Sequence, residues 1–390
     1  MKRENVEDLY RLSPTQEGLL FHSLAGGEAA PYFEQFVVHH GALDPALIER
    51  SLEQLFARHP ILRTSFSWEK VEKPVQIVHR RVELPFRHED WSGLATEERE
   101  RRLPALLAQE RARGFDLTRP PLLRLIHIRW DADSSRIVWN FHHLLIDGWS
   151  FALVSQEMRM LYEAALQSRQ AALPQRRPFR DYIGWLRRQD QAAAEAYWRN
   201  ALAGFASPTV LAADLAPGSP ALEGSYAEED LVVDEEATAA LQALARTHRL
   251  TLYTLIEGAL GFTLGRFAGT DDVVFGNTVS GRPASLPGAD AMIGCFINTL
   301  PVRVTLPPEE ELAAWLKRLQ TEQTAQRQFE YSSLLDVRGW SGLPGNRPLF
   351  EAIMVFESSS AIIERSESWQ GYQRTNFPLT MVVWPGKDLV

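Results

Sequence analysis

The chain has 390 residues, of which 45% are hydrophobic and 23% are charged, so it is long enough for two core-forming units. Its net charge of −9 is spread along the sequence, with no basic stripe typical of nucleic-acid binding and no lysine-rich helix typical of a membrane surface. The single cysteine, Cys295, excludes an internal disulfide and a cysteine-built metal site, and the charged N-terminus and the lack of a long apolar run predict a cytoplasmic protein.

Signals for helices and strands alternate along the chain, which predicts an α/β or α+β fold. Ser13 and Gln16 occupy the positions of a capping box around Pro14 and predict the start of the first helix. The next expected elements are a helix that opens at Asp44-Pro45 and ends before Pro60, strands over residues 61–66, 123–130 and 136–142, and a helix capped by Ser150.

A polar stretch from about residue 166 to 178 predicts a linker between an N-terminal lobe, residues 1–170, and a C-terminal lobe, residues 171–390. The second lobe is expected to contain helices over 237–249 and 251–267 and strands over 272–276 and 296–304. The chain ends on an apolar strand signal, MVVWPGKDLV, so we expect the natural polypeptide to continue and this lobe to be truncated.

Two adjacent histidines and an Asp-Gly pair lie between a predicted strand and a predicted helix, in HHLLIDGWS at residues 142–150. Side chains alternate along a strand, so His142 and His143 are expected to face opposite sides, which argues against a shared metal ion. One imidazole can then act on a substrate while the other is held inside by hydrogen bonds. Asp147 can cap the helix or pair with an arginine, and Gly148 permits a positive φ and close approach of its N–H to a substrate. A satisfied core histidine beside an ordinary Asp-Gly turn is the alternative interpretation.

This segment resembles the H-H-x-x-x-D-G motif of condensation domains of nonribosomal peptide synthetases, in the superfamily that includes chloramphenicol acetyltransferase. Related acyltransferases and epimerisation domains share the motif, but other segments similar to the family's own occur in family order along nearly the whole chain. They are LSPTQEGLLFHSL (12–24), RHPILRTSF (58–66), FRDYIGWL (179–186), IGCFINTLPVR (293–303), GNRPLFEAIMVFES (345–358) and NFPLTMVV (376–383). One departure is Tyr331-Ser332-Ser333, which replaces the family's frequent H-x-x-x-P-F-E motif, so that motif supports no substrate inference here.

The resemblance implies a fold of two chloramphenicol-acetyltransferase-like lobes that form a V-shaped pseudo-dimer with a central tunnel. It implies attack of a carrier-bound acceptor amine on a carrier-bound donor thioester, which forms an amide bond. The implied partners are an upstream donor and a downstream acceptor peptidyl carrier protein and a neighbouring adenylation domain. The carrier proteins deliver 4'-phosphopantetheine arms, and no cofactor is expected to be bound by the chain itself.

The resemblance also assigns roles within the motif. His143 is expected in the tunnel, either as the base for the attacking amine or as a group that only orients it, and Gly148 is expected to donate its N–H to an oxyanion. His142 and Asp147 are expected to support the structure of the site. The partner of Asp147 is expected to be Arg282 in VSGRP, which matches the family's arginine, with Arg63 as the second choice. Without the resemblance, Arg282 is an exposed loop residue and Arg63 an edge-strand residue.

The first motif and HHLLIDGWS are most similar to the subtype that joins a D-configured donor to an L-configured acceptor, with an all-L subtype as the alternative. An epimerisation domain is a further alternative, although the second lobe lacks the expected glutamate-bearing motif. A non-catalytic recruitment domain of the same fold is another, although the motif is intact. A free acyltransferase that uses coenzyme A is the last alternative.

Overall fold

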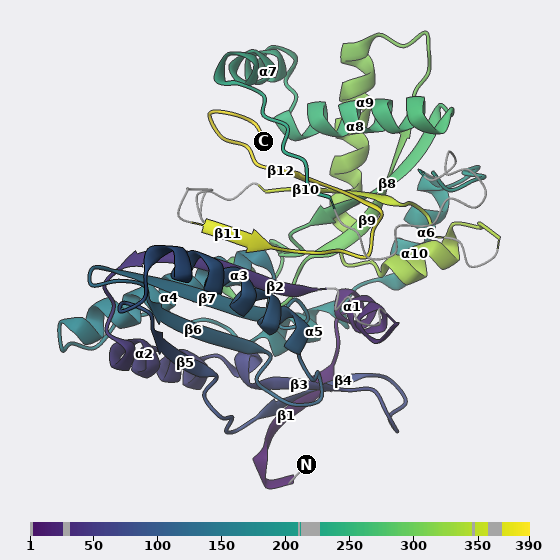
Figure 1. Ribbon diagram of the computed structural model, residues 1–390. Helices are drawn as coiled ribbons and strands as arrows, with labels where there is room; N and C mark the ends of the chain where they lie inside the picture. Colours follow the sequence, from purple (N-terminus) through teal and green to yellow (C-terminus); the bar gives the residue numbers. More distant parts are fainter. Residues whose placement is uncertain (1–2, 26–31, 210, 212–226, 345–347, 358–368) are drawn as a thin grey trace, which may run out of the picture. The chain divides into compact units, whose positions relative to one another are not determined.

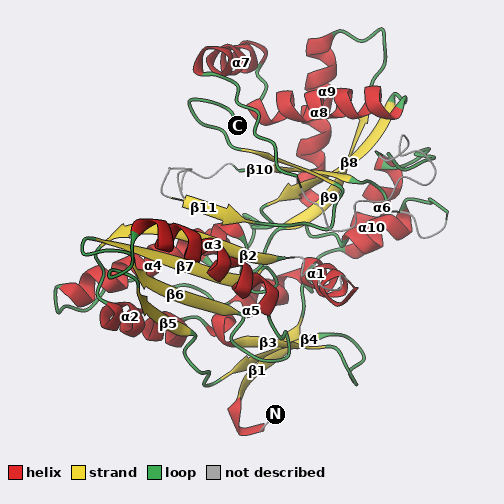
Figure 2. Cartoon of the chain, in the orientation of Figure 1, coloured by secondary structure: helices red, strands yellow, loops and turns green. Residues whose placement is uncertain are grey.

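The computed structural model describes residues 3–25, 32–209, 211, 227–344, 348–357 and 369–390 (Figure 1). The chain divides into two compact units. The first comprises Met1–Arg188, Arg282–Phe296 and Ser359–Asn376, and the second comprises Gln189–Gly281, Ile297–Ser358 and Phe377–Val390. Helices and strands are mixed in both units, which confirms the predicted α/β class (Figure 2). The lobe boundary near residue 170 and the V-shaped arrangement with its tunnel stay predictions.

The first unit contains two sheets. The order of the five-stranded sheet is β11 (Trp369–Tyr372), β2 (Phe33–Gly41), β7 (Ser134–His142), β6 (Leu123–Arg129) and β5 (Phe86–Asp90). The order of the three-stranded sheet is β1 (Val6–Arg11), β4 (Val75–His79) and β3 (Thr64–Ser67). The helices are α1 (Pro14–Ala25), α2 (Pro45–Arg58), α3 (Thr96–Arg113), α4 (Gly148–Leu166) and α5 (Phe179–Leu186), with short 3-10 helices at Arg3–Asn5, Pro60–Arg63 and Ala289–Ala291.

Alternation along β2 and β7 determines which helix packs on which face of the five-stranded sheet. The rings of Phe36 in β2 and Phe141 in β7 both stack on Phe151 of α4, with centroids 4.8 and 5.0 Å apart. Val138 points to the opposite face, where it packs in one cluster with Leu103 of α3. The sheet is therefore buried between α4 on one face and α3 on the other.

The local signals predicted most of these elements correctly. The capping box is confirmed, because the Ser13 N–H donates to Gln16 Oε1 at 3.0 Å and the Gln16 N–H donates to Ser13 Oγ at 3.2 Å. Helix α2 begins after Asp44, whose side chain caps it. The strand predicted over residues 61–66 is wrong in its first half. Residues Pro60–Arg63 form a 3-10 helix, held by the Arg63 Nε bond to the Phe56 carbonyl at 2.9 Å, and β3 begins only at Thr64.

The second unit has one four-stranded sheet with helices on both faces. The order of its strands is β12 (Leu379–Val383), β10 (Ala352–Phe356), β8 (Asp272–Val279) and β9 (Asn298–Thr305). The helices are α6 (Gln191–Ala201), α7 (Glu235–His248), α8 (Leu252–Ala268), α9 (Leu312–Gln326) and α10 (Leu334–Trp340), with a 3-10 helix at Arg327–Phe329. Phe275 faces α8 and α9, whereas the neighbouring Val274 faces Trp198 of α6 and Val337 of α10. Across the described part of the chain, no helix combines the length and the apolar character needed to cross a bilayer.

Candidate active site at the end of strand β7

The histidine pair lies where β7 ends and a tight turn leads into α4. Strand β7 ends at His142, and the His143 N–H still donates to the Tyr32 carbonyl at 2.9 Å. The turn is held from below by Gln16, a fully buried α1 residue whose side-chain amide donates to the Leu144 carbonyl at 2.9 Å. The backbone that carries both imidazoles is therefore fixed by hydrogen bonds on each side.

His142 is an internal residue with both ring nitrogens in use. Its Nδ1 accepts the Leu144 N–H at 3.1 Å, so the ring proton lies on Nε2, which points at Ser23 Oγ at 3.3 Å. Ser23 in turn donates to the Leu19 carbonyl at 2.7 Å. Burial, with the charge of His143 as a smaller cause, lowers the pKa of His142 to about 3. This imidazole is neutral at physiological pH and links the turn to α1.

His143 has a different environment although it is the next residue. Its side chain is only partly buried, and its Nδ1 is buried without a hydrogen-bond partner among the described residues. A buried polar atom without a partner is uncommon in proteins and needs an explanation, which function often supplies. Of the two imidazoles, only that of His143 has hydrogen-bonding capacity to spare for a substrate.

Asp147 is fully buried and accepts hydrogen bonds on both carboxylate oxygens. Oδ1 accepts the Ser150 N–H at 2.7 Å and lies 3.3 Å from Arg282 Nη2, and Oδ2 accepts the Phe296 N–H at 2.8 Å. Asp147 is thus the N-cap of α4, and the prediction that Ser150 caps this helix is wrong. A carboxylate caps better here because it also pairs with a cation, and Ser150 instead donates to the Gly294 carbonyl at 2.7 Å.

The two candidate arginines have different partners. Arg282 lies against Asp147 and also donates to the carbonyls of Ala289 and Met292 at 2.6 and 2.9 Å. Arg63 pairs with Glu7 at 2.6 Å. The structure therefore places Arg282, and not Arg63, beside the Asp147 carboxylate.

Gly148 is the first residue of α4, and the expected positive φ does not occur there. A Cβ at this position would meet no atom within 4 Å, so the fold itself does not require glycine. By contrast, a Cβ on Gly294 would lie 2.1 Å from the Phe179 ring, so the close approach of these segments does require glycine. The N–H of Gly148 has no acceptor within the helix because the first four amides of a helix have none.

Metal ligands and a nucleophilic thiol do not gather at this turn. Among the described residues, no group of three His, Cys, Asp or Glu side chains is arranged to hold a metal ion. Cys295 is fully buried, and burial, with Asp147 as a smaller cause, raises the pKa of its thiol well above the usual value. The thiol is therefore protonated at neutral pH.

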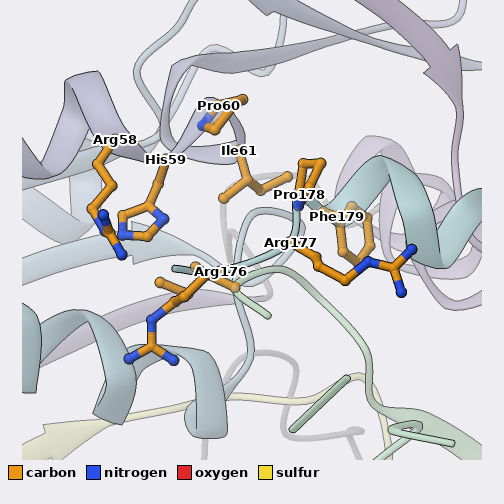
Figure 3. Close-up of a pocket in the computed structure, with 9 residues that line it drawn as sticks. Arg58, His59, Pro60, Ile61, Arg176, Arg177, Pro178 and Phe179 are labelled. Atoms are coloured by element: carbon orange, nitrogen blue, oxygen red, sulfur yellow. The ribbon is translucent and has the colours of Figure 1, made fainter. Parts of the chain in front are cut away.

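A second cluster of charged residues surrounds a cavity of about 270 Å³ between the end of α2 and the start of α5 (Figure 3). Arg58, His59 and Arg176 pair there with Glu157 of α4, and Figure 3 shows the Arg177 side chain pointing away from them. Burial alone would raise the pKa of Glu157, but hydrogen bonds from His59 and Arg176 and their charges lower it to about 2. The cations of this cluster are thus already paired, and none of the six predicted site residues lines the cavity.

The fold and the site together define an α/β protein that carries its H-H-x-x-x-D-G motif at a strand end. The family model described as Condensation domain matches residues 6–389, so the chain belongs to the condensation-domain family. One of the linear gramicidin synthase proteins of Brevibacillus parabrevis is 43% identical over 392 residues, which cover 99% of this chain and 8% of that protein. This chain thus spans a small part of that relative. Condensation domains of nonribosomal peptide synthetases catalyse amide-bond formation.

Two solved structures share the fold. The first condensation domain of the calcium-dependent antibiotic synthetase, in complex with a substrate analogue, has a TM-score of 0.76 at 19% identity. The alignment covers 99% of this chain and 91% of that one. A four-domain nonribosomal peptide synthetase bound to AMP and glycine has a TM-score of 0.78 at 19% identity, with 98% of this chain and 31% of that chain covered.

Several residues of the site were not identified from the sequence. The Phe296 N–H that binds Asp147 is 149 positions away, and a backbone donor leaves no side-chain signal. Ser23, which receives the His142 ring, stands in the first motif and could have been suspected from the capping helix that carries it. Glu34, a charged residue in the apolar run YFEQFVV, was the clearest missed signal.

Proposed function

We propose that this chain catalyses attack of a carrier-bound acceptor amine on a carrier-bound donor thioester, with His143 as the residue that acts on the amine. The acceptor nitrogen forms a C–N bond to the thioester carbonyl, and the imidazole accepts the proton that this nitrogen loses. The C–S bond then breaks with its electron pair on sulfur, and the imidazolium returns the proton to the thiolate. Most of the rate enhancement should come from holding two tethered reactants within reacting distance.

The contrast between the two histidines carries this proposal. His142 spends both ring nitrogens on the Leu144 N–H and Ser23, whereas His143 keeps a buried Nδ1 without a partner among the described residues. Asp147 and Arg282 are arranged as supports for the turn, because their hydrogen bonds go to the backbone and to each other. This division fits a turn built to present one imidazole.

Gly148 is proposed as a donor to the tetrahedral oxyanion. Its N–H belongs to the first turn of α4, where unpaired amides and the helix dipole favour negative charge. The space at its Cα, where an added Cβ would have no atom within 4 Å, leaves room for a substrate to approach the backbone.

The donor and acceptor are proposed to arrive as thioesters of 4'-phosphopantetheine arms on an upstream and a downstream peptidyl carrier protein, with an adenylation domain as neighbour. Support comes from the chain's 98% coverage by one part of a four-domain synthetase that was solved bound to AMP and glycine. The arms are substrates of the site rather than groups that it retains.

Substitution of His143 tests the proposal. We expect His143→Ala to lower the rate of dipeptidyl-carrier formation by about 10²-fold or more, because a positioned acid–base group contributes on this scale. Product on the acceptor carrier is measured by mass spectrometry, and the melting temperature should stay near that of the wild type. His248→Ala, at the end of α7, is the matched control and should keep the wild-type rate. Wild-type turnover by His143→Ala refutes the role of this residue.

The finer proposal is the D-donor and L-acceptor subtype, which is supported by the similarity of the first motif and of HHLLIDGWS to that subtype. Donors of identical composition that end in a D- or an L-residue are loaded on the same carrier and compared. We expect the D-terminated donor to give the higher kcat/KM. An equal or higher value for the L-terminated donor assigns the all-L subtype, and transfer from acyl-coenzyme A alone assigns a free acyltransferase.

A further inference from the structure

Glu34 in β2 is a buried acidic residue whose cost to the fold is not offset by a cation. Its side chain is 3% exposed, and its Oε2 has no hydrogen-bond partner among the described residues. Burying a carboxyl group without full hydrogen bonding is unfavourable, and such groups are expected to be replaced unless they have a use. Glu110 of α3 shows the usual solution, because its carboxylate is 2% exposed and pairs with Arg124 at 2.9 Å.

The register of the sheet places Glu34 beside His143. Glu34 lies opposite Phe141 in the antiparallel pair of β2 and β7, and the His143 N–H binds the Tyr32 carbonyl. Phe36 and Phe141 share one face of the sheet, as their contacts with α4 show. Because residues two apart lie on the same face, Glu34 and His143 are diagonal neighbours on that face.

The third strand fixes the other side of the Glu34 carboxyl group. Tyr372 of β11 pairs with Gln35, so the next residue, Gln373, lies across from Glu34. Burial raises the pKa of Glu34, while the proximity of His143 and a hydrogen bond from Gln373 oppose this shift. Gln373 can hold one part of the carboxyl group, which leaves Oε2 as the free acceptor.

Two buried polar atoms without described partners therefore lie in one neighbourhood, Oε2 of Glu34 and Nδ1 of His143. We propose that Glu34 is a positioning residue for His143, whose ring it orients and whose imidazolium it stabilises while the acceptor's proton resides there. Glu34 itself exchanges no proton, since the proton passes from the acceptor nitrogen to the imidazole and then to the leaving thiolate. This inference rests on the proposed role of His143 and adds a residue that acts through it.

The test compares Glu34→Gln, Glu34→Asp and His143→Ala with the wild type in the same carrier-protein assay. Because Gln keeps the shape and removes the charge, we expect Glu34→Gln to lower kcat at least about tenfold, with KM for both carriers changed less than about twofold. Its melting temperature should not fall, because the substitution removes an unpaired buried acid. Glu34→Asp keeps the charge and should recover part of the lost kcat.

Glu110→Gln is the matched control, a buried carboxyl group of the same unit that lies outside the catalytic residues. It should lower the melting temperature through loss of its Arg124 pair and leave kcat within about twofold of the wild type. Wild-type kcat in Glu34→Gln, or a rise in KM alone, overturns the positioning role while His143→Ala still reports the proposed function. A fall in both kcat and melting temperature that Glu34→Asp does not relieve also overturns it. Full activity of His143→Ala would instead remove the proposed function itself.

Discussion

Each compact unit contains a completely buried carboxyl group on or beside a helix, and the two groups compared here have opposite kinds of neighbour. Asp147, after β7, has Arg282 and two backbone N–H donors within hydrogen-bonding distance. Glu257, on α8 of the second unit, accepts from the Tyr253 hydroxyl at 3.0 Å and from the Gln323 side chain, which are both neutral. Both carboxyl groups are 0% exposed, so the difference lies in the partners and not in the burial.

The consequence is a difference in how the cost of burial is avoided. Asp147 is compensated by a cation and by the N-terminus of α4, which suits a buried negative charge. For Glu257, burial raises the pKa to about 8, with Glu322 as an additional, smaller cause. Glu257 is therefore mostly a neutral acid at pH 7 and avoids the cost by keeping its proton. The same side-chain chemistry thus gives an ionic support beside the candidate active site and an uncharged link between α8 and α9 in the second unit.

Removal of Asp147 should have the largest effect on this comparison. Asp147→Ala leaves Arg282, whose side chain is 4% exposed, without its counter-ion and removes the cap of α4. We expect the free energy of unfolding to fall by about 3–5 kcal/mol, as when one partner of a buried ion pair is deleted. Urea denaturation and soluble yield measure this loss.

The control for that measurement is Asp181→Ala, which breaks an exposed pair with Arg177. It should change the free energy of unfolding by about 0–1 kcal/mol. If Asp147→Ala were as stable as the wild type and lost only turnover, Asp147 would act in the chemistry, and its comparison with Glu257 as a second structural carboxyl group would fail.

The sequence predicted those parts of the fold that depend on neighbours in the chain. The capping box of Ser13 and Gln16 and the start of α2 after Asp44 use hydrogen bonds within three residues, so the pattern alone determines them. The segment after Pro60 was misread because an apolar run allows both a strand and a 3-10 turn, and the Arg63 bond to the Phe56 carbonyl decides between them.

The candidate site was predictable only where a side chain carries the contact. Arg282 was found as the partner of Asp147 through its family resemblance, because no spacing rule connects positions 135 residues apart. The Phe296 N–H and the Gly294 carbonyl were invisible, since every residue type offers these groups. Glu34 differs, because a charge inside an apolar strand is itself a signal, and only the pairing of β2 with β7 shows what it faces.

Glu257 gives the smaller and more diagnostic test, because its effect depends on pH. Its folded pKa of about 8 lies above the ordinary value of 4.5, so the folded state holds a proton that the unfolded state releases. This contribution to stability is fully present below about pH 4.5 and is lost as the pH rises toward 8, by about 1.4 kcal/mol per unit at most. Glu257→Gln is permanently neutral and cannot show this loss.

We therefore expect the melting temperature of the wild type to fall more steeply between pH 6 and pH 9 than that of Glu257→Gln. Glu163→Gln, an exposed residue of α4, is the control and should keep the wild-type slope. Parallel pH profiles for the wild type and Glu257→Gln would mean that Glu257 is ionised at neutral pH despite its neutral donors. Asp147 and Glu257 would then be stabilised in the same way, and the partners that separate them here would not set their charge.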